Sequence, residues 1–493
     1  MGKKTSLITY VQNLFNMFLK GKSLKARMAQ SAIWVGFGSS IDRVLRLLRN
    51  IILTRILAPE DFGIMAIVLS INEFFQAITE MGIRNAIIQN PHGDKQTYLN
   101  GAWWLSSCRA VGLYSVVFIF SPYISRFYEN TELTMFIRVA FLGVLFNGSM
   151  SSKAYVAIKK MNFKHWVLIS NGGGVFGIIV SIVMAFIIPN TWALVIGVTS
   201  EACARFILSY IICPFMPGIK FEKKHLQPLF RYARGTFGIP LLYFIFMRTD
   251  IFVIGKLLPN KELGTYAMAV TLARMPLGFI ASLFSEILMP ALSEIQAEKE
   301  RFNRLILQPI SIILFLGFPA LMFVMFYGKD LLHILYGEQY AYVAIPFAVV
   351  FASELLRVSS LPIATAYLAV GHPEIHRLFN VIRAVLMILL IYPFVSAYGL
   401  IGASVTGFIA MVVALFFQLH QIRKLTNFNV KDFYIVFFKA FCISLIVAIF
   451  WIITDGIVSS GYIKMIIGVS ACLLSYIILF LWHTKDKSNK VIQ

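Results

Sequence analysis

The chain has 493 residues, of which 58% are hydrophobic and only 14% are charged, and its mean hydropathy is +0.77. A water-soluble domain carries about a quarter charged residues, so the composition excludes a protein with a water-facing surface and predicts an all-α integral membrane protein. The net charge of +21 would suit a nucleic-acid partner, but the aromatic residues lie in apolar runs of membrane length, so no nucleic acid is predicted.

Residues 1–28 form a basic segment with a modest apolar patch between Ser6 and Leu19. Polar residues interrupt this patch, and a second basic cluster follows it without a small-residue cleavage site, which argues against a signal peptide. We predict a cationic amphipathic helix that lies on the cytoplasmic face of the membrane.

About fourteen apolar runs of membrane length follow, each bounded by polar or charged residues. They lie at 30–57, 62–88, 100–122, 133–157, 165–188, 191–213, 233–258, 264–290, 305–326, 342–370, 377–396, 399–421, 433–454 and 462–482. The first six form a predicted N-lobe at 29–213 and the next six a C-lobe at 233–422, joined by a cytoplasmic linker at 214–232. Two further spans at 433–482 and a cytoplasmic tail at 483–493 complete the chain.

Basic residues are concentrated in the loops that this arrangement places in the cytoplasm, such as the one with Lys159 and Lys160. The loops predicted to lie outside hold only Arg126, Lys261 and Lys329. The positive-inside rule therefore places both termini in the cytoplasm. The same loop residues, held near an anionic inner leaflet, account for most of the positive charge.

The chain contains an internal repeat at a spacing of about two hundred residues. Asn50–Leu57 followed by Pro59–Gly63 matches Asp250–Leu257 followed by Pro259–Gly264, with one inserted residue. A second match falls on spans four and ten. A duplicated six-helix unit predicts two lobes related by an axis along the membrane normal, with the last two spans as additions; the alternative is chance similarity between apolar segments.

Charged residues at membrane depth are costly unless they face a cavity or a partner. On the first span, Asp42, Arg43, Arg46 and Arg49 fall within about a third of the helix circumference. Arginine donates two hydrogen bonds to phosphate oxygens and stays charged. The stripe therefore predicts a cavity that attracts a pyrophosphate-bearing substrate, and the alternative is a set of buried ion pairs with carboxylates of the first two spans.

The second span has a polar face of its own, because Glu73, Gln76, Glu80 and Arg84 follow one another at helical spacing. Carboxylates at membrane depth can couple transport to an ion gradient by changing protonation, and structural pairing of each is the alternative. The predicted coupling residues are Asp42, Glu73, Glu80 and Glu354. Isolated arginines are predicted to snorkel to the interface or to form single packing pairs. They are Arg109, Arg138, Arg205 and Arg383.

Gly172–Gly177 satisfies the GxGxxG pattern, but it opens a membrane helix and follows no strand, so we predict close helix packing instead of a dinucleotide site. The five cysteines lie singly in apolar stretches, and neither a metal site nor a cofactor is predicted. No loop collects the carboxylates, histidine or activated nucleophile that bond chemistry needs, so an enzyme is not expected.

The stretch ILTRILAPEDFGIMA at 52–66 and the stretch EMGIRNAIIQ at 80–89 resemble the start of bacterial polysaccharide exporters of the Wzx flippase kind. The likeness is to the colanic-acid and teichuronic-acid branch of the multidrug/oligosaccharidyl-lipid/polysaccharide exporter superfamily. The span count and the repeat also fit the plan of that superfamily, two six-helix lobes with a terminal pair.

The resemblance implies that the chain moves an undecaprenyl-pyrophosphate-linked oligosaccharide across the bacterial cytoplasmic membrane by alternating access, for surface polysaccharide synthesis. It also implies, from related lipid II flippases, that cavity arginines hold the pyrophosphate. By position these are Arg43, Arg46 and Arg49 on span one, Arg84 on span two and Arg274 on span eight. Polysaccharide polymerase and other assembly proteins are the implied partners.

Two other functions are open at this point. A multidrug exporter of the same superfamily would expel cationic drugs, and the excess of arginine at membrane depth argues against it. A polymerase or ligase acting on lipid-linked sugars would need a large outer loop with catalytic residues, and the longest predicted outer loop, roughly Tyr327–Tyr342, is too small.

Overall fold

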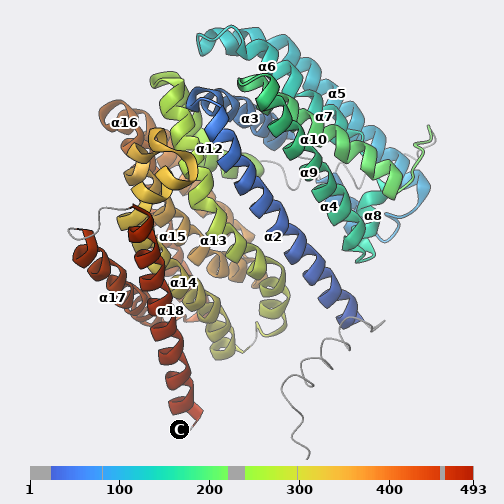
Figure 1. Cartoon of the computed structure of the whole chain (residues 1–493). Helices are drawn as coiled ribbons and strands as arrows, with labels where there is room; N and C mark the ends of the chain where they lie inside the picture. Colours follow the sequence, from blue (N-terminus) through green and yellow to red (C-terminus); the bar gives the residue numbers. More distant parts are fainter. Residues whose placement is uncertain (1–23, 80–81, 220–238, 297, 456–460, 492–493) are drawn as a thin grey trace, which may run out of the picture. The chain divides into compact units, whose positions relative to one another are not determined.

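The computed structural model describes residues 24–79, 82–219, 239–296, 298–455 and 461–491, which are coloured in Figure 1. Every regular element in these residues is a helix, one of them a short 3-10 helix. The predicted all-α class is confirmed. The amphipathic helix predicted within 1–28, most of the linker predicted at 214–232 and the end of the tail predicted at 483–493 lie outside the described residues.

The described residues form two compact units. The first contains the residues up to Ile56 and those from Ile71 to Pro240, and the second contains Leu57–Ser70 and the residues from Leu241 onward. Helix α3, which runs from Pro59 to Thr79, therefore begins in the second unit and ends in the first.

The first unit is built from helices of very different length, and the end of α3 belongs to it. Its other helices are α2 (Leu24–Ile56), α4 (Ile83–Gln89), α5 (Gln96–Phe127), α6 (Leu133–Ala140), α7 (Leu142–Gly148), α8 (Lys153–Lys159), α9 (Phe163–Ile187) and α10 (Thr191–Ile212).

The second unit contains longer helices. They are α12 (Ile239–Leu257), α13 (Asn260–Glu294), α14 (Lys299–Tyr336), the 3-10 helix η1 (Glu338–Val343), α15 (Ala344–Ala369), α16 (Pro373–Thr426), α17 (Val430–Asp455) and α18 (Gly461–Val491).

Nine helices in the described part of the chain are long and apolar enough to cross a membrane, or ten if the bent run from α6 to α8 is one span. Helix α16 covers both spans predicted at 377–396 and 399–421, and Gly399, with φ 55°, breaks it between them. Large apolar side chains are exposed along these helices: Phe186 is 72% exposed and Ile452 is 67% exposed. Such a surface suits lipid and confirms a multi-pass membrane protein.

Two spans predicted as single helices are broken. The run predicted at 62–88 is divided into α3 and α4 at Gly82, whose φ of 57° is left-handed. The run predicted at 133–157 bends by 61° before α8. At this bend, the Ser151 backbone N–H donates to Ser209 Oγ over 3.0 Å and its hydroxyl donates to the Cys213 carbonyl over 2.6 Å, so the freed polar groups are satisfied.

The two turns of the predicted repeat meet within the second unit. A Cβ on Gly63 would overlap the backbone carbonyl of Asn260, and a Cβ on Gly264 would overlap the backbone carbonyl of Pro59. The first turns of α3 and α13 therefore touch backbone to backbone, which only glycine permits.

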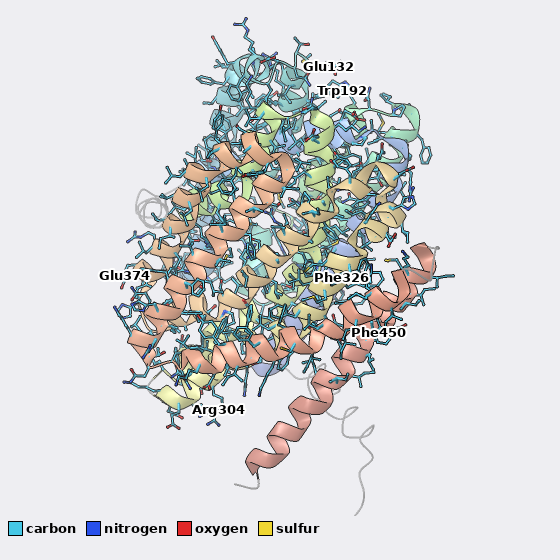
Figure 2. All side chains as sticks on the ribbon, turned by 90° about the vertical axis from the view of Figure 1, so that its left-hand side faces the viewer. Glu132, Trp192, Arg304, Phe326, Glu374 and Phe450 are labelled. Carbon is cyan, nitrogen blue, oxygen red and sulfur yellow. The ribbon has the colours of Figure 1, made fainter. Side chains whose placement is uncertain are left out.

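The last two helices pack against α14. Phe326 of α14 and Phe450 of α17, labelled in Figure 2, pack against the same buried cluster, which also contains Cys472 of α18. The Tyr476 hydroxyl of α18 donates to the Leu316 carbonyl over 3.0 Å. Arg304 and Glu374, labelled in the same view, are exposed at helix ends of this unit.

Candidate functional site

The cationic stripe predicted on the first span forms an ion-pair network in the first unit. Arg46 of α2 lies 2.9 Å from the Asp42 carboxylate and 2.7 Å from the Glu201 carboxylate of α10. Arg205 lies 2.5 Å from the same Glu201 oxygen. Each helix contributes residues at i and i+4, so each presents its pair on one face. Arg46 is therefore paired with Asp42, a partner that the ion-pair alternative included, and with Glu201 of the sixth predicted span, which that alternative did not include.

Close packing of α9 holds this network together. A Cβ on Gly173 would lie 3.0 Å from the Glu201 carbonyl oxygen, and a Cβ on Gly177 would lie 2.9 Å from the Gly197 carbonyl oxygen. On another face of α9, a Cβ on Gly174 would lie 3.0 Å from an Asp42 carboxylate oxygen. The glycine run therefore lets α2 and α10 approach α9, and the prediction of close helix packing is confirmed.

The other predicted residues of α2 and α3 make contacts of their own or lie outside the described residues. The Arg49 guanidinium donates to the side-chain oxygen of Asn50 over 2.9 and 3.2 Å. Arg43 interacts electrostatically with its neighbour Asp42. Glu73 is exposed on α3, and Glu80 lies outside the described residues.

A polar cavity of about 410 Å³ lies wholly within the first unit. Small-molecule sites occupy roughly 300–1,000 Å³. Six helices, α3, α4, α5, α7, α8 and α9, contribute side chains to it, and polar groups dominate the lining. The lining includes Gln76, Arg84, Asn85, Ser106, Arg109, Asn147, Tyr155 and Trp166.

Two arginines reach this cavity. The guanidinium carbon of Arg84 lies 4.9 Å from the ring centroid of Trp166, a cation–π contact, and no carboxylate among the described residues pairs with it. Arg109 of α5 donates from Nε to the Thr79 hydroxyl over 3.2 Å. The family resemblance implied that Arg84 faces a cavity, whereas Arg109 was expected to snorkel to the interface or to form a single packing pair, because no local pattern connects α4 with α5.

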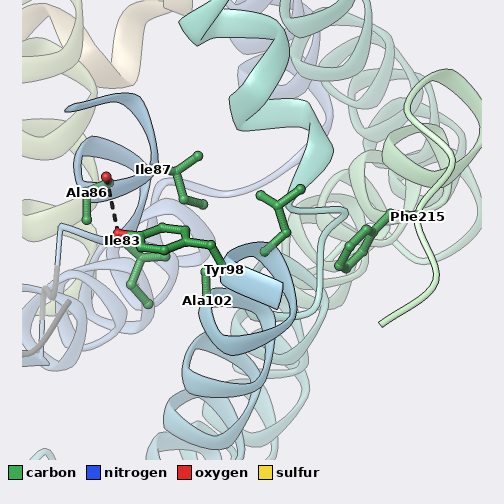
Figure 3. Packing of buried hydrophobic residues seen from close by; sticks show 7 residues of the cluster. Ile83, Ala86, Ile87, Tyr98, Ala102 and Phe215 are labelled. Atoms are coloured by element: carbon green, nitrogen blue, oxygen red, sulfur yellow. Dashed lines mark hydrogen bonds between the residues drawn. The ribbon is translucent and has the colours of Figure 1, made fainter. Parts of the chain in front are cut away.

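A buried apolar cluster fixes the short helix α4 that carries Arg84. Ile83, Ala86 and Ile87 of α4 pack against Tyr98 and Ala102 of α5, as Figure 3 shows. The Tyr98 hydroxyl donates to the Ala86 carbonyl over 3.3 Å. A helix of 7 residues is unstable alone, so this cluster determines where Arg84 and Asn85 point.

Arg274 and Glu354 both line a small cavity of about 30 Å³ in the second unit. Glu354 is 4% exposed and lies 2.6 Å from Arg357. Arg274 donates to the Met247 carbonyl over 3.5 Å, and Tyr266 donates to Asp250 over 3.0 Å. The part of Glu354 in ion coupling stays a prediction.

The remaining isolated arginines make local packing contacts. Arg138 lies 3.9 Å from the Phe118 ring centroid and donates to Ser121 over 3.0 Å. Arg383 is only 8% exposed and lies 4.7 Å from the Phe246 ring centroid, so it does not snorkel. In the described part of the chain, no three His, Cys, Asp or Glu side chains gather as a metal site requires.

The chain is similar in sequence to proteins of bacterial polysaccharide synthesis. It is 24% identical to an uncharacterised membrane protein in the cps region of Klebsiella pneumoniae, over 92% of this chain and 96% of that one. It is 22% identical to the lipopolysaccharide biosynthesis protein WzxC of Escherichia coli, over 81% of this chain and 80% of that one.

A solved structure shares the fold. The lipid II flippase MurJ in an inward closed conformation superposes with a TM-score of 0.75 at 14% identity, over 91% of this chain and 98% of that one. The model of the family described as polysaccharide biosynthesis protein matches residues 52–345, which include the cavity and more than half of the chain. The chain belongs to this polysaccharide biosynthesis protein family.

Proposed function

We propose that the chain is a transporter that flips an undecaprenyl-pyrophosphate-linked oligosaccharide across the bacterial cytoplasmic membrane for surface polysaccharide synthesis. The observation that carries the proposal is the polar cavity in a membrane-embedded unit, with Arg84 free of a carboxylate partner in the described residues. A transporter accounts for it better than an enzyme, because the described residues that line the cavity include no carboxylate or histidine for acid–base chemistry.

The two cavity arginines are suited to the diphosphate. Each guanidinium presents a planar set of donors that matches two phosphate oxygens, and its charge does not depend on pH near neutrality. A hydrogen bond to a charged group contributes about 1.5–3 kcal/mol, so one such contact changes affinity more than tenfold. Arg46 is less suited, because a phosphate would have to displace two carboxylates from it.

The position of the cavity supports entry from the cytoplasmic side, where lipid-linked sugars are assembled. Lys95 precedes α5, and Lys159 ends α8 and donates to the Asn90 carbonyl over 2.6 Å. Both lysines belong to connections that the charge pattern places in the cytoplasm. The cavity lies next to these connections along the chain, through Arg84 and Tyr155.

A complementation experiment tests the function. In a strain of the source organism that lacks the gene, wild-type protein restores surface polysaccharide, whereas Arg84→Ala with Arg109→Ala lowers the amount at least tenfold. Arg126→Ala is the matched control, because Arg126 is an exposed arginine in the last turn of α5 outside the cavity. Equal membrane levels are checked by immunoblot.

The same strain distinguishes the other functions. Unchanged polysaccharide in the deletion strain, together with increased sensitivity to cationic drugs, would assign the chain to multidrug export. Polymer formation by the purified protein would assign it to the enzymes of the pathway. Full activity of the double arginine variant would remove the phosphate site from the proposal.

A further inference from the structure

The lining of the cavity in the first unit includes two aromatic side chains as well as amide side chains. The aromatic residues are Trp166 of α9 and Tyr155 of α8, with ring centroids 5.9 Å apart and an interplanar angle of 38°. Both residues are partly exposed. Aromatic faces offer a large, rigid apolar surface whose electron-rich face attracts positively polarised groups.

Trp166 differs from the structural tryptophans of the same unit. The indole N–H of Trp103 donates to the Ser149 carbonyl over 3.1 Å and to the Tyr210 hydroxyl over 2.9 Å. The indole N–H of Trp104 donates to the Gly218 carbonyl over 3.2 Å. The indole N–H of Trp166 has no hydrogen-bond partner among the described residues. This donor is therefore available to a ligand in the cavity.

Two amides complete the polar part of the lining. Asn85 of α4 and Asn147 of α7 have exposed side chains at the cavity, and neither has a side-chain hydrogen-bond partner among the described residues. An amide group provides both donors and an acceptor. A phosphate accepts hydrogen bonds but, when ionised, donates none, so the acceptor oxygens of these amides have no use in a purely anionic site.

We infer that this cavity binds a sugar ring next to the diphosphate, with Trp166 and Tyr155 against the C–H face of the ring and Asn85 and Asn147 bonded to its hydroxyls. Hydroxyl groups both donate and accept, which matches the amides, while the axial hydrogens of a pyranose match an aromatic face. This inference rests on the proposed function. It adds that the chain reads the first sugar of the lipid-linked substrate in addition to its phosphates.

Binding of defined lipids to the purified full-length protein in detergent tests the inference. The probes are undecaprenyl pyrophosphate alone and the same lipid carrying glucose, galactose or N-acetylglucosamine. At least one sugar-bearing lipid is expected to bind about tenfold more tightly than the bare lipid, equal to about 1.4 kcal/mol. If all three bind with the affinity of the bare lipid, the inference is wrong.

Variants separate sugar reading from phosphate binding. Trp166→Leu is expected to weaken the sugar-bearing lipid about tenfold more than the bare lipid, because it removes the aromatic face for the sugar in addition to the ring beneath Arg84. Arg84→Ala is expected to weaken all four lipids together. Trp104→Leu is the matched control and should retain the preference, since Trp104 lies outside the cavity lining.

Two outcomes would overturn separate claims. If Trp166→Leu weakens the bare and the sugar-bearing lipids equally, Trp166 only orients Arg84 and reads no sugar. Asn147→Ala then serves as a second check, because the Asn147 side chain lines the cavity without a hydrogen bond to another described residue, and its loss should reduce only the sugar preference. If the wild-type protein binds none of the four lipids, the proposed function itself fails.

Discussion

Arg46 and Arg84 show how the partner of a side chain decides its part in a membrane protein. Both residues lie on helices of the first unit. Arg46 has carboxylate oxygens at 2.9 and 2.7 Å, whereas Arg84 lies against the Trp166 ring and lines a cavity. Removing one member of a buried ion pair is more costly than having no pair, because the remaining charge stays buried. Loss of Glu201 alone would therefore be costly, whereas Arg84 is available to a ligand.

Glu201→Gln is expected to destabilise the protein by about 3 kcal/mol, because it leaves Arg46 and Arg205 without their shared carboxylate charge. Thermal unfolding of the purified protein in detergent measures the effect. Glu300→Gln, an exposed carboxylate in the first turn of α14, should leave the melting temperature unchanged. Equal melting temperatures for Glu201→Gln and wild type would show that the network contributes nothing.

Sequence reasoning predicted the positions of these residues but only some of their contacts. Asp42 and Arg46 are four residues apart, so helical periodicity places them together, and the structure has them paired. Glu201 lies 155 residues from Arg46, and no local pattern connects them. Trp166 was indistinguishable from a packing residue, since the property that marks it, an unused indole N–H at a cavity, exists only after folding.

Helix α4 shows how a short element depends on its neighbours. It has 7 residues, too few for a stable isolated helix, and its position comes from the cluster around Tyr98. The sequence predicted one continuous span here, because a left-handed glycine at Gly82 cannot be distinguished from an ordinary helical glycine by composition. The break allows Arg84 and Asn85 to reach the cavity while Ala86 and Ile87 stay buried.

Tyr98→Ala is expected to cost about 3–5 kcal/mol of stability, because it removes a fully buried ring behind α4. Tyr98→Phe should cost only about 1 kcal/mol, since it keeps the buried ring and loses the hydroxyl that donates to the Ala86 carbonyl. Unfolding temperature and surface polysaccharide are measured for both. Tyr398→Ala, at a residue 67% exposed, is the control and should match wild type. Equal losses for the two Tyr98 variants would contradict this account of α4.

At the scale of the whole molecule, apolar side chains are exposed and several charged side chains are buried, as a lipid environment requires. Large apolar side chains such as Phe186 and Ile452 face outward, whereas Glu201 and Glu354 are buried. Composition alone predicted this class, because the shortage of charge is a property of the entire chain. The orientation of the chain in the membrane follows from the distribution of its lysines and is a prediction.

Cysteine labelling tests this orientation. In a cysteine-free variant, a membrane-impermeant maleimide added to intact cells should label Lys261→Cys and should label Lys160→Cys only after the membrane is opened. Both lysines are exposed, so accessibility within the protein does not differ between them. The reverse order of labelling would invert the predicted topology and place the cavity beside the outer leaflet.

The contact between Gly63 and Gly264 is reciprocal, since the backbone beside each glycine fills the space that a side chain on the other would need. Two copies of one surface meet in this manner in an isologous interface. Such a contact sets the same steric requirement at both positions. A side chain on one glycine adds an overlap that a replacement of the other glycine cannot relieve, so neither position is expected to accept a larger residue, alone or together.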